Sequence, residues 1–339
     1  MKTSARLLLG GVFAASMIAA DDGFAQQVTA AGDIPVFHVQ QNVYMVVGPA
    51  GNSAVQVGAD GVVVVDTMTS AAAPKLVAAI RSLSPRNILQ IINTDGHAER
   101  TGGNALMAQA TRYVINDQNA RPAGFGAGSP ILAHEHVLQN MSADKGTYKA
   151  GPELWPTESY FEDQRDLFLN GEGIEIHFQP AAHTNGDSLV YFRRSDVLVT
   201  GDIFTPQQYP VFDIENGGSI NGVIAGLNHI LRITVPAKNE EGGTYVIPGR
   251  GHVCDEADVS DYRDMVTIVR DRVQDALKKK MTLEQVRAAR LTRDYDGIYA
   301  SAEYTGDMFV ESVYKSLSAS STGDAKPATG DKAAPRSKR

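Results

Sequence analysis

Five short apolar runs of this chain each end in a cluster of polar residues, and this arrangement limits the possible folds more than any other feature. The segments, each an apolar run with its polar end, are residues 62–66, 91–100, 174–187, 197–202 and 245–252. Short runs rich in valine and isoleucine predict buried strands. Because loops that follow such strands can converge at one edge of a sheet, we expect an α/β fold with one crevice lined by Asp, His and Glu side chains.

The rest of the pattern places helices between these strands. Expected strands span residues 43–47, 53–57, 62–65, 88–92, 113–115, 167–169, 174–178, 188–192, 197–200 and 245–247, and expected helices span 71–83, 102–110, 219–231 and 258–279. The last two helices carry apolar residues at helical spacing. Each half of the chain has strands first and helices after, which predicts a four-layer αββα sandwich.

Both ends of the chain are expected to lie outside the folded unit. A basic start precedes an apolar run, and small residues then lead to a cleavage point after Ala25. This pattern is typical of a secretory signal peptide, so residues 1–25 predict a protein that is periplasmic or secreted. Residues 316–339 contain almost no large apolar side chain and predict a disordered C-terminal tail. The folded domain is therefore expected at 28–315.

Composition excludes several classes of partner. The net charge of −8 argues against nucleic acid, which would require a basic face. No second long apolar run follows the signal segment, so no stable membrane insertion is expected after its removal. Cys254 is the only cysteine, which excludes an internal disulfide. A small-molecule substrate is the expected partner, and the oligomeric state stays open.

The spacing of the polar residues resembles one known family. The chain has Asp66, then Asp95-x-His97-x-Glu99-Arg100 followed by Gly102-Gly103, then His183, Thr200-Gly201-Asp202, and Pro248-Gly249-x-Gly-His252. Metallo-β-lactamase-fold hydrolases carry an early Asp, His-x-His-x-Asp-His before Gly-Gly, a separated His, an Asp after Thr-Gly, and a His after Pro-Gly. The resemblance extends over nearly the whole folded unit and implies a metal-dependent hydrolase of the exported bacterial type.

The resemblance also implies two metal positions. The first would be formed by Asp95, His97 and His183, with Asp202 as a bridge. The second would be formed by Glu99, Asp202 and His252, and it is one ligand short, because Arg100 stands where a histidine usually helps to hold the second ion. A guanidinium has no lone pair to offer. We therefore expect one zinc ion rather than two.

The ligand types affect the choice of metal. Asp95 replaces a histidine of the family pattern, and Glu99 replaces an aspartate. Carboxylates make the site harder and more anionic, so manganese or iron could take the place of zinc. Both carboxylates could alternatively cap a helix or form salt bridges, while Arg100 could pair with Glu99 or Asp202.

The expected activity is hydrolysis of an ester, thioester, lactone or amide by a metal-bound hydroxide. Asp202 or Glu99 would orient the water or take its proton. Two alternatives remain at this point. One is a class B-like β-lactamase, although such enzymes usually have cysteine where this chain has Asp202. The other is a degenerate member of the fold that binds a ligand without catalysis.

Other polar residues have simpler expected roles. Asp66 is expected to orient a ligand or hold a turn, and Asp187 to lie in a turn. His134 and His136 are expected on the surface of a helix. Tyr209 could contact substrate near the mouth of the site or pack in the core.

Overall fold

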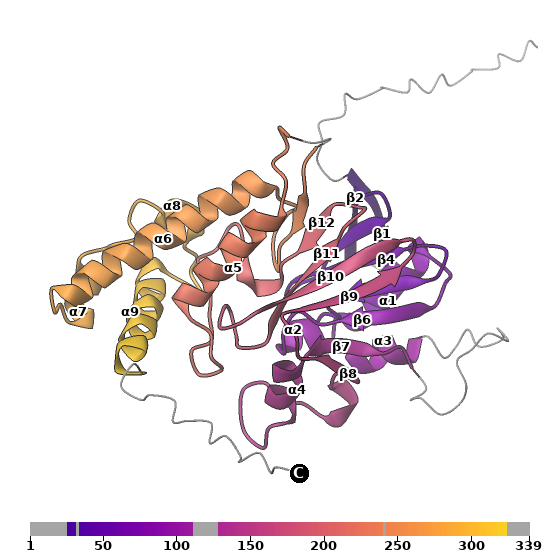
Figure 1. The fold of residues 1–339 in the computed structure, drawn as a ribbon, viewed down its shortest axis with the longest axis horizontal. Coiled ribbons are helices and arrows are strands. Elements are labelled where there is room, and N and C mark those ends of the chain that lie inside the picture. Colours follow the sequence, from indigo (N-terminus) through magenta and orange to yellow (C-terminus); the bar gives the residue numbers. More distant parts are fainter. Residues whose placement is uncertain (1–25, 32–33, 111–127, 240–241, 324–339) are drawn as a thin grey trace, which may run out of the picture.

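A computed structural model describes residues 26–31, 34–110, 128–239 and 242–323, and the two central sheets of this part lie face to face (Figure 1). The expected signal peptide and the expected strand at 113–115 fall outside the described residues. None of the helices in the described ranges is long and apolar enough to cross a membrane.

The first sheet contains eight strands within the described residues and follows chain order from β1 to β8. These strands are β1 (Gln26–Ala31), β2 (Ile34–Gln40), β3 (Val43–Val47), β4 (Asn52–Val57), β5 (Val62–Val65), β6 (Ile88–Ile92), β7 (Ile131–His134) and β8 (Glu158–Tyr160). Neighbours are antiparallel up to β5 and parallel from β5 to β8. The polar segment after β6 therefore leaves the sheet at the same edge as the residues after β5.

The second sheet has the order β13-β12-β11-β10-β9 in the same described part. Its strands are β9 (Gln164–Leu169), β10 (Glu172–Gln179), β11 (Asp187–Phe192), β12 (Val197–Val199) and β13 (Tyr245–Ile247). Only β12 and β13 pair in parallel, and the other neighbours are antiparallel. Thr200 and Pro248, which open two of the expected motifs, consequently follow parallel strands side by side.

Alternation along β5 shows how the layers form. Val63 and Val65 belong to the core between the two sheets, together with Ile176 of β10. Val62 and Val64 belong instead to the core under α1 (Ala73–Leu83). Successive strand residues point to opposite faces, so an unbroken run of valines indicates a strand that is covered on both sides.

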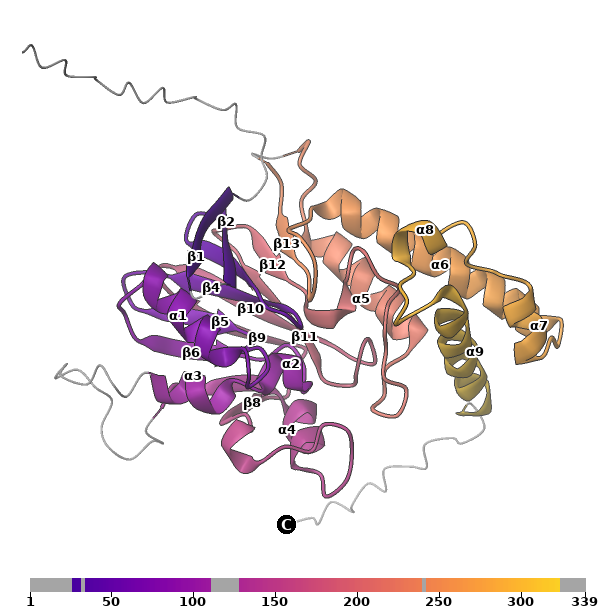
Figure 2. The ribbon, with the colours of Figure 1, turned by 180° about the vertical axis from the view of Figure 1, so that it is seen from behind.

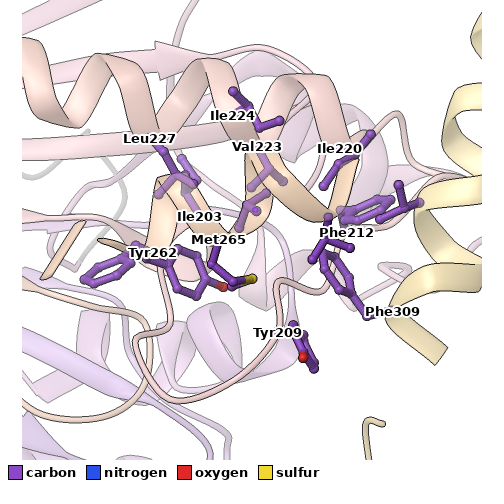
Figure 3. Close-up of a cluster of buried hydrophobic side chains, with 14 of the residues drawn as sticks. Ile203, Tyr209, Phe212, Ile220, Val223, Ile224, Leu227, Tyr262, Met265 and Phe309 are labelled. Carbon is purple, nitrogen blue, oxygen red and sulfur yellow. The ribbon is translucent and has the colours of Figure 1, made fainter. Parts of the chain in front are cut away.

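Helices cover the outer face of each sheet and complete the four-layer αββα sandwich (Figures 1 and 2). Helices α1 and α3 (Asn104–Ala110) lie on the first sheet, and α5 (Ile220–Ile233) and α6 (Glu256–Lys278) lie on the second. Val223 and Leu227 of α5 meet Tyr262 and Met265 of α6 in one buried cluster (Figure 3). The αββα prediction is confirmed.

The C-terminal helix corrects the expected domain boundary. Helix α9 (Gly306–Gly323) continues past residue 315 into the segment that was expected to be a tail. Phe309, Val313 and Leu317 lie on one face of this helix and are buried in the cluster with α5 and α6, which explains why the chain stays helical there. Residues 324–339 are outside the described part. Phe309 stacks on Tyr209 at 4.8 Å between ring centroids, so Tyr209 is a packing residue.

Several short elements were not expected from the sequence. They are α2 (Ala98–Thr101), η2 (Pro152–Leu154), η3 (Gly201–Ile203), α7 (Leu283–Ala288) and α8 (Asp296–Tyr299), besides β1, β2, β7 and β8, whereas α4 (Glu135–Ser142) is the helix that was expected to carry His136. The prediction for His134 was wrong. This residue ends β7 and is buried, because its imidazole stacks on the ring of Phe178, with 3.6 Å between ring centroids, and is shielded from solvent.

Candidate metal centre

Four of the six expected ligands meet at one edge of the two sheets. Asp95 and His97 lie between β6 and α2, His183 lies between β10 and β11, and Asp202 lies in η3 after β12. One ligand atom from each of these side chains lies within 4.8 Å of all the others. The convergence follows from the topology, since all three segments are connections at the same end of their strands.

The two histidines face each other with atoms that can bind a cation. His183 Nδ1 lies 2.7 Å from the carbonyl oxygen of Val211, to which it donates, so the lone pair of His183 is on Nε2. That Nε2 atom lies 3.2 Å from Nδ1 of His97. His97 Nδ1 in turn lies 3.0 Å from Oδ1 of Asp95. His183 Nε2 and Asp95 Oδ1 carry lone pairs and both face His97 Nδ1, so either a proton on that nitrogen or a metal ion would satisfy all three atoms.

A proton meets this requirement when no metal is bound. Burial alone would lower the pKa of His97, but the carboxylate of Asp95 outweighs it and raises this pKa to about 9. A divalent ion would have to displace that proton. The same atoms are therefore suited to either cation.

Asp95 also has an oxygen that accepts no hydrogen bond within the described residues. Its Oδ1 accepts a hydrogen bond from the backbone N–H of His97 at 2.7 Å. Its Oδ2 is buried and has no hydrogen-bond partner within the described residues. Arg100 Nε lies 3.9 Å from this oxygen, too far for a hydrogen bond, so the buried carboxylate of Asp95 keeps the capacity to bind a cation beside His97, His183 and Asp202. The donor set of two imidazoles and two carboxylates is one that zinc, manganese and iron accept.

Arg100 lies fully buried beside this group. Its Nη2 donates to Asp202 Oδ1 at 2.5 Å and its Nε to Asp202 Oδ2 at 3.3 Å. Backbone carbonyls of Asn52 and Gly249 accept two further hydrogen bonds. Although burial opposes ionisation, the carboxylate of Asp202 holds the pKa of Arg100 above its usual value. The guanidinium thus binds Asp202 with a permanent positive charge on the side where the family pattern has a second ligand.

The expected second metal position is not assembled in the described part of the chain. Glu99 pairs with Arg250 at 3.2 Å rather than with Arg100. His252 is exposed and groups with Cys254 and Asp258. Neither Glu99 nor His252 belongs to the group that contains Asp202.

A cavity opens onto three of the four clustered residues, His97, His183 and Asp202. Its volume is about 210 Å³, and its walls are formed by His97, Glu99, His183, Asp202, Thr205, Gln208, Val211 and Arg250. Both Glu99 and Arg250 thus reach the cavity, although Glu99 lies outside the ligand group. A small substrate group could enter here and reach the imidazoles.

Two buried aspartates hold the loops that carry the ligands. Asp66 accepts hydrogen bonds from the backbone N–H and the hydroxyl of Thr94, each at 2.8 Å. Asp187 binds Thr184 in the same way. Burial raises the pKa of each carboxyl to about 7. Each threonine is next to a clustered residue, so Asp66 and Asp187 position loops, as expected for Asp66.

Three residues of the site were not identified from the sequence. The hydroxyl of Tyr148 lies 2.8 Å from His97 Nε2 and donates a hydrogen bond to Asp213, the second of these residues, at 3.1 Å. The third, Arg250, lies inside the Pro-Gly-x-Gly-His motif, in which only His252 was predicted to have a role. Tyr148 lies in a loop without regular spacing to any motif, so no linear signal indicates it.

The sequence pattern of the metallo-beta-lactamase superfamily matches residues 39–268, and the chain belongs to that superfamily. This assignment agrees with the sandwich of two sheets and with the loops that carry the clustered ligands. The superfamily prediction is confirmed, and its members are commonly metal-dependent hydrolases.

Solved structures similar to this chain agree on the fold. The sec-alkylsulfatase Pisa1 from Pseudomonas sp. has a TM-score of 0.62 and 16% identity, over 88% of this chain and 52% of that chain. A metallo-beta-lactamase from Pontibacter korlensis has a TM-score of 0.53 and 14% identity, over 69% of this chain and 99% of that chain. The DIM-1 metallo-beta-lactamase has a TM-score of 0.51 and 16% identity, over 69% of this chain and 97% of that chain. This chain therefore spans about half the length of the sulfatase, and the likeness concerns the fold.

Proposed function

We propose that this protein is a metal-dependent hydrolase that binds one ion between Asp95, His97, His183 and Asp202. The observation that carries the proposal is the pair of acceptor atoms that face His97 Nδ1, together with the buried oxygen of Asp95 that has no hydrogen bond within the described residues. Zinc is the proposed ion, and the two carboxylates would also suit manganese or iron.

When bound, the ion would polarise the scissile bond and make water more acidic. The protein's own residues supply the rest. Arg100 keeps Asp202 ionised and fixed, so Asp202 serves to hold the ion. Glu99 lines the cavity with a side chain that is 30% exposed. We assign Glu99 as the carboxylate that orients the attacking water and accepts its proton.

The cavity argues for a small reacting group. Its 210 Å³ is below the range of about 300–1,000 Å³ that is usual for drug-sized ligands. An ester, thioester, lactone or amide carbonyl fits this space, with the remainder of the substrate outside. The similar solved structures add an alkyl sulfate ester and a β-lactam to the compounds worth testing.

A substrate panel tests the proposal. Purified protein is assayed with a nitrophenyl ester, a thioester, a lactone, a secondary alkyl sulfate and a chromogenic cephalosporin, before and after removal of metal by a chelator. We expect turnover of at least one acyl substrate that is lost with the chelator and restored by zinc.

Glu99→Gln should lower kcat by about 100-fold, the usual scale for removal of a general base. Glu303→Gln is the matched control, since Glu303 is exposed. Cleavage of the cephalosporin alone would favour the β-lactamase alternative. Metal binding with no turnover on any compound would overturn the hydrolase and leave a ligand-binding member of the fold.

A further inference from the structure

The imidazole of His97 is held on its outer side by a chain of hydrogen bonds that ends in a carboxylate. Its Nε2 lies 2.8 Å from the hydroxyl of Tyr148, which donates to Oδ2 of Asp213 at 3.1 Å. Tyr148 is only 4% exposed, and its ring lies edge-on to the imidazole at 4.4 Å. Solvent therefore has little access to this side of His97.

The direction of this chain is fixed by its far end. Asn216 donates to Asp213 twice, from its backbone N–H at 3.1 Å and from its side-chain amide at 2.7 Å. Asp213 is thus an acceptor on both oxygens, and the hydroxyl of Tyr148 has its proton directed toward it. The oxygen of Tyr148 must then accept from His97, which places a proton on Nε2.

The consequence for His97 is a defined tautomer. With Nε2 protonated, the lone pair of the neutral imidazole is on Nδ1, the atom that faces His183 and Asp95. A partner on the remaining nitrogen of a ligating histidine fixes its orientation and strengthens its bond to the metal.

The same segment also orients the second histidine. The carbonyl oxygen of Val211 accepts from His183 Nδ1 at 2.7 Å, and the backbone N–H of Asp213 donates to the carbonyl oxygen of His183 at 2.7 Å. Residues 211–213 therefore contact both imidazoles, one directly and one through Tyr148.

We propose that Tyr148 and Asp213 are positioning residues that hold His97 as an Nδ1 ligand, and that residues 211–213 thereby fix the metal-facing tautomers of both histidines. The inference rests on the proposed metal site but does not depend on the identity of the substrate. It assigns a function to two residues that lie outside every motif of the sequence.

Metal affinity tests the proposal without any activity assay. Zinc dissociation constants are measured by competition with a chromophoric chelator for the parent, Tyr148→Phe, Asp213→Asn and the double variant. Tyr148→Phe keeps the ring packing and should weaken zinc binding by about 10- to 100-fold. Asp213→Asn should weaken it less, because an amide oxygen can still accept from Tyr148. The double variant should be no worse than Tyr148→Phe, since the two residues act through one chain.

Two controls separate positioning from simple stabilisation. Tyr191→Phe removes a similar hydrogen bond, which Tyr191 donates to Asp196. Neither residue belongs to the metal site, so this variant should leave zinc affinity unchanged. The Tm of each metal-free protein is also measured. A purely structural role for Tyr148 would lower that Tm and leave the affinity of the folded protein as in the parent, which would overturn the proposal.

His183→Ala distinguishes this proposal from the proposed function. If the parent binds zinc, His183→Ala does not, and Tyr148→Phe binds within twofold of the parent, only the positioning proposal is overturned. If His183→Ala binds zinc as tightly as the parent, the metal site itself is wrong and both proposals are overturned.

Discussion

At the scale of single residues, Arg100 defines this site. Its buried guanidinium contacts Asp202 and lies 3.8–3.9 Å from oxygens of Asp66 and Asp95. Two glycines leave room for it. A Cβ atom at Gly51 or at Gly249 would lie 2.7 Å from a nitrogen of Arg100. The loops after β3 and β13 are thus shaped around the arginine, which makes it part of the architecture and not a loose surface substitution.

Also at this scale, His134 predicts an acid-sensitive fold. Burial and the neighbouring His136 lower the pKa of His134 to about 4, compared with 6.5 in an unfolded chain. Between these values the unfolded state binds more protons than the folded state, so stability falls as the pH decreases from 6.5 toward 4. Between pH 7 and pH 5 this one residue should reduce the free energy of unfolding by about 2 kcal/mol.

Urea titrations at both pH values check this prediction. In His134→Gln the difference in the free energy of unfolding between pH 7 and pH 5 should be smaller by that amount, even if the variant is less stable at both pH values. An unchanged difference would show that His134 is protonated in the fold.

At the scale of elements, the start of α5 packs against the loop that carries His183. A Cβ atom at Gly222 would lie 1.7 Å from the carbonyl oxygen of Ala181, a backbone atom that also accepts from Ser219. Gly222→Ala should therefore push this loop away, with a loss of about 1–3 kcal/mol in stability and weaker zinc binding. Calorimetry and the zinc titration check both effects.

Gly297→Ala is the matched control for this change. Gly297 lies in α8, where a Cβ atom would meet nothing within 4 Å. The control should be neutral or slightly stabilising. Equal losses in the two variants would contradict the close contact between α5 and the loop.

The elements that the sequence predicted share a clear physical signal. Strand β5 consists of four valines, a composition that predicts a strand buried on both faces. Helix α5 repeats Val223, Leu227 and Ile230 at helical spacing, a pattern that predicts a helix buried on one face. Strands β7 and β8 are short, and their residues count as strands only because neighbours pair with them. Helix α9 was not predicted, and its last turns fell in the expected tail because small residues follow Leu317.

At the scale of the whole molecule, the sequence predicted which loops converge and four of the side chains that meet there, but not that Glu99 and His252 lie outside this group. Asp95, His97, His183 and Asp202 follow predicted strands, and the parallel and antiparallel pairings bring them together. His252 follows a predicted strand as well, yet it lies with Cys254 and Asp258. Tyr148 and Asp213 reach the site through tertiary contacts alone, and no local pattern encodes them. The exported location also stays a prediction, since residues 1–25 lie outside the described part.

The most direct test of the account is the number of metal ions bound at this site. Native mass spectrometry is applied to zinc-supplied parent protein, to His183→Ala, and to His252→Ala, which separates any ion held near Cys254. We predict one ion in the parent, kept in His252→Ala and lost in His183→Ala, because Arg100 occupies the side of Asp202 where a second ion would bind. Two ions in the parent that are both lost in His183→Ala, or no ion at all, would contradict it.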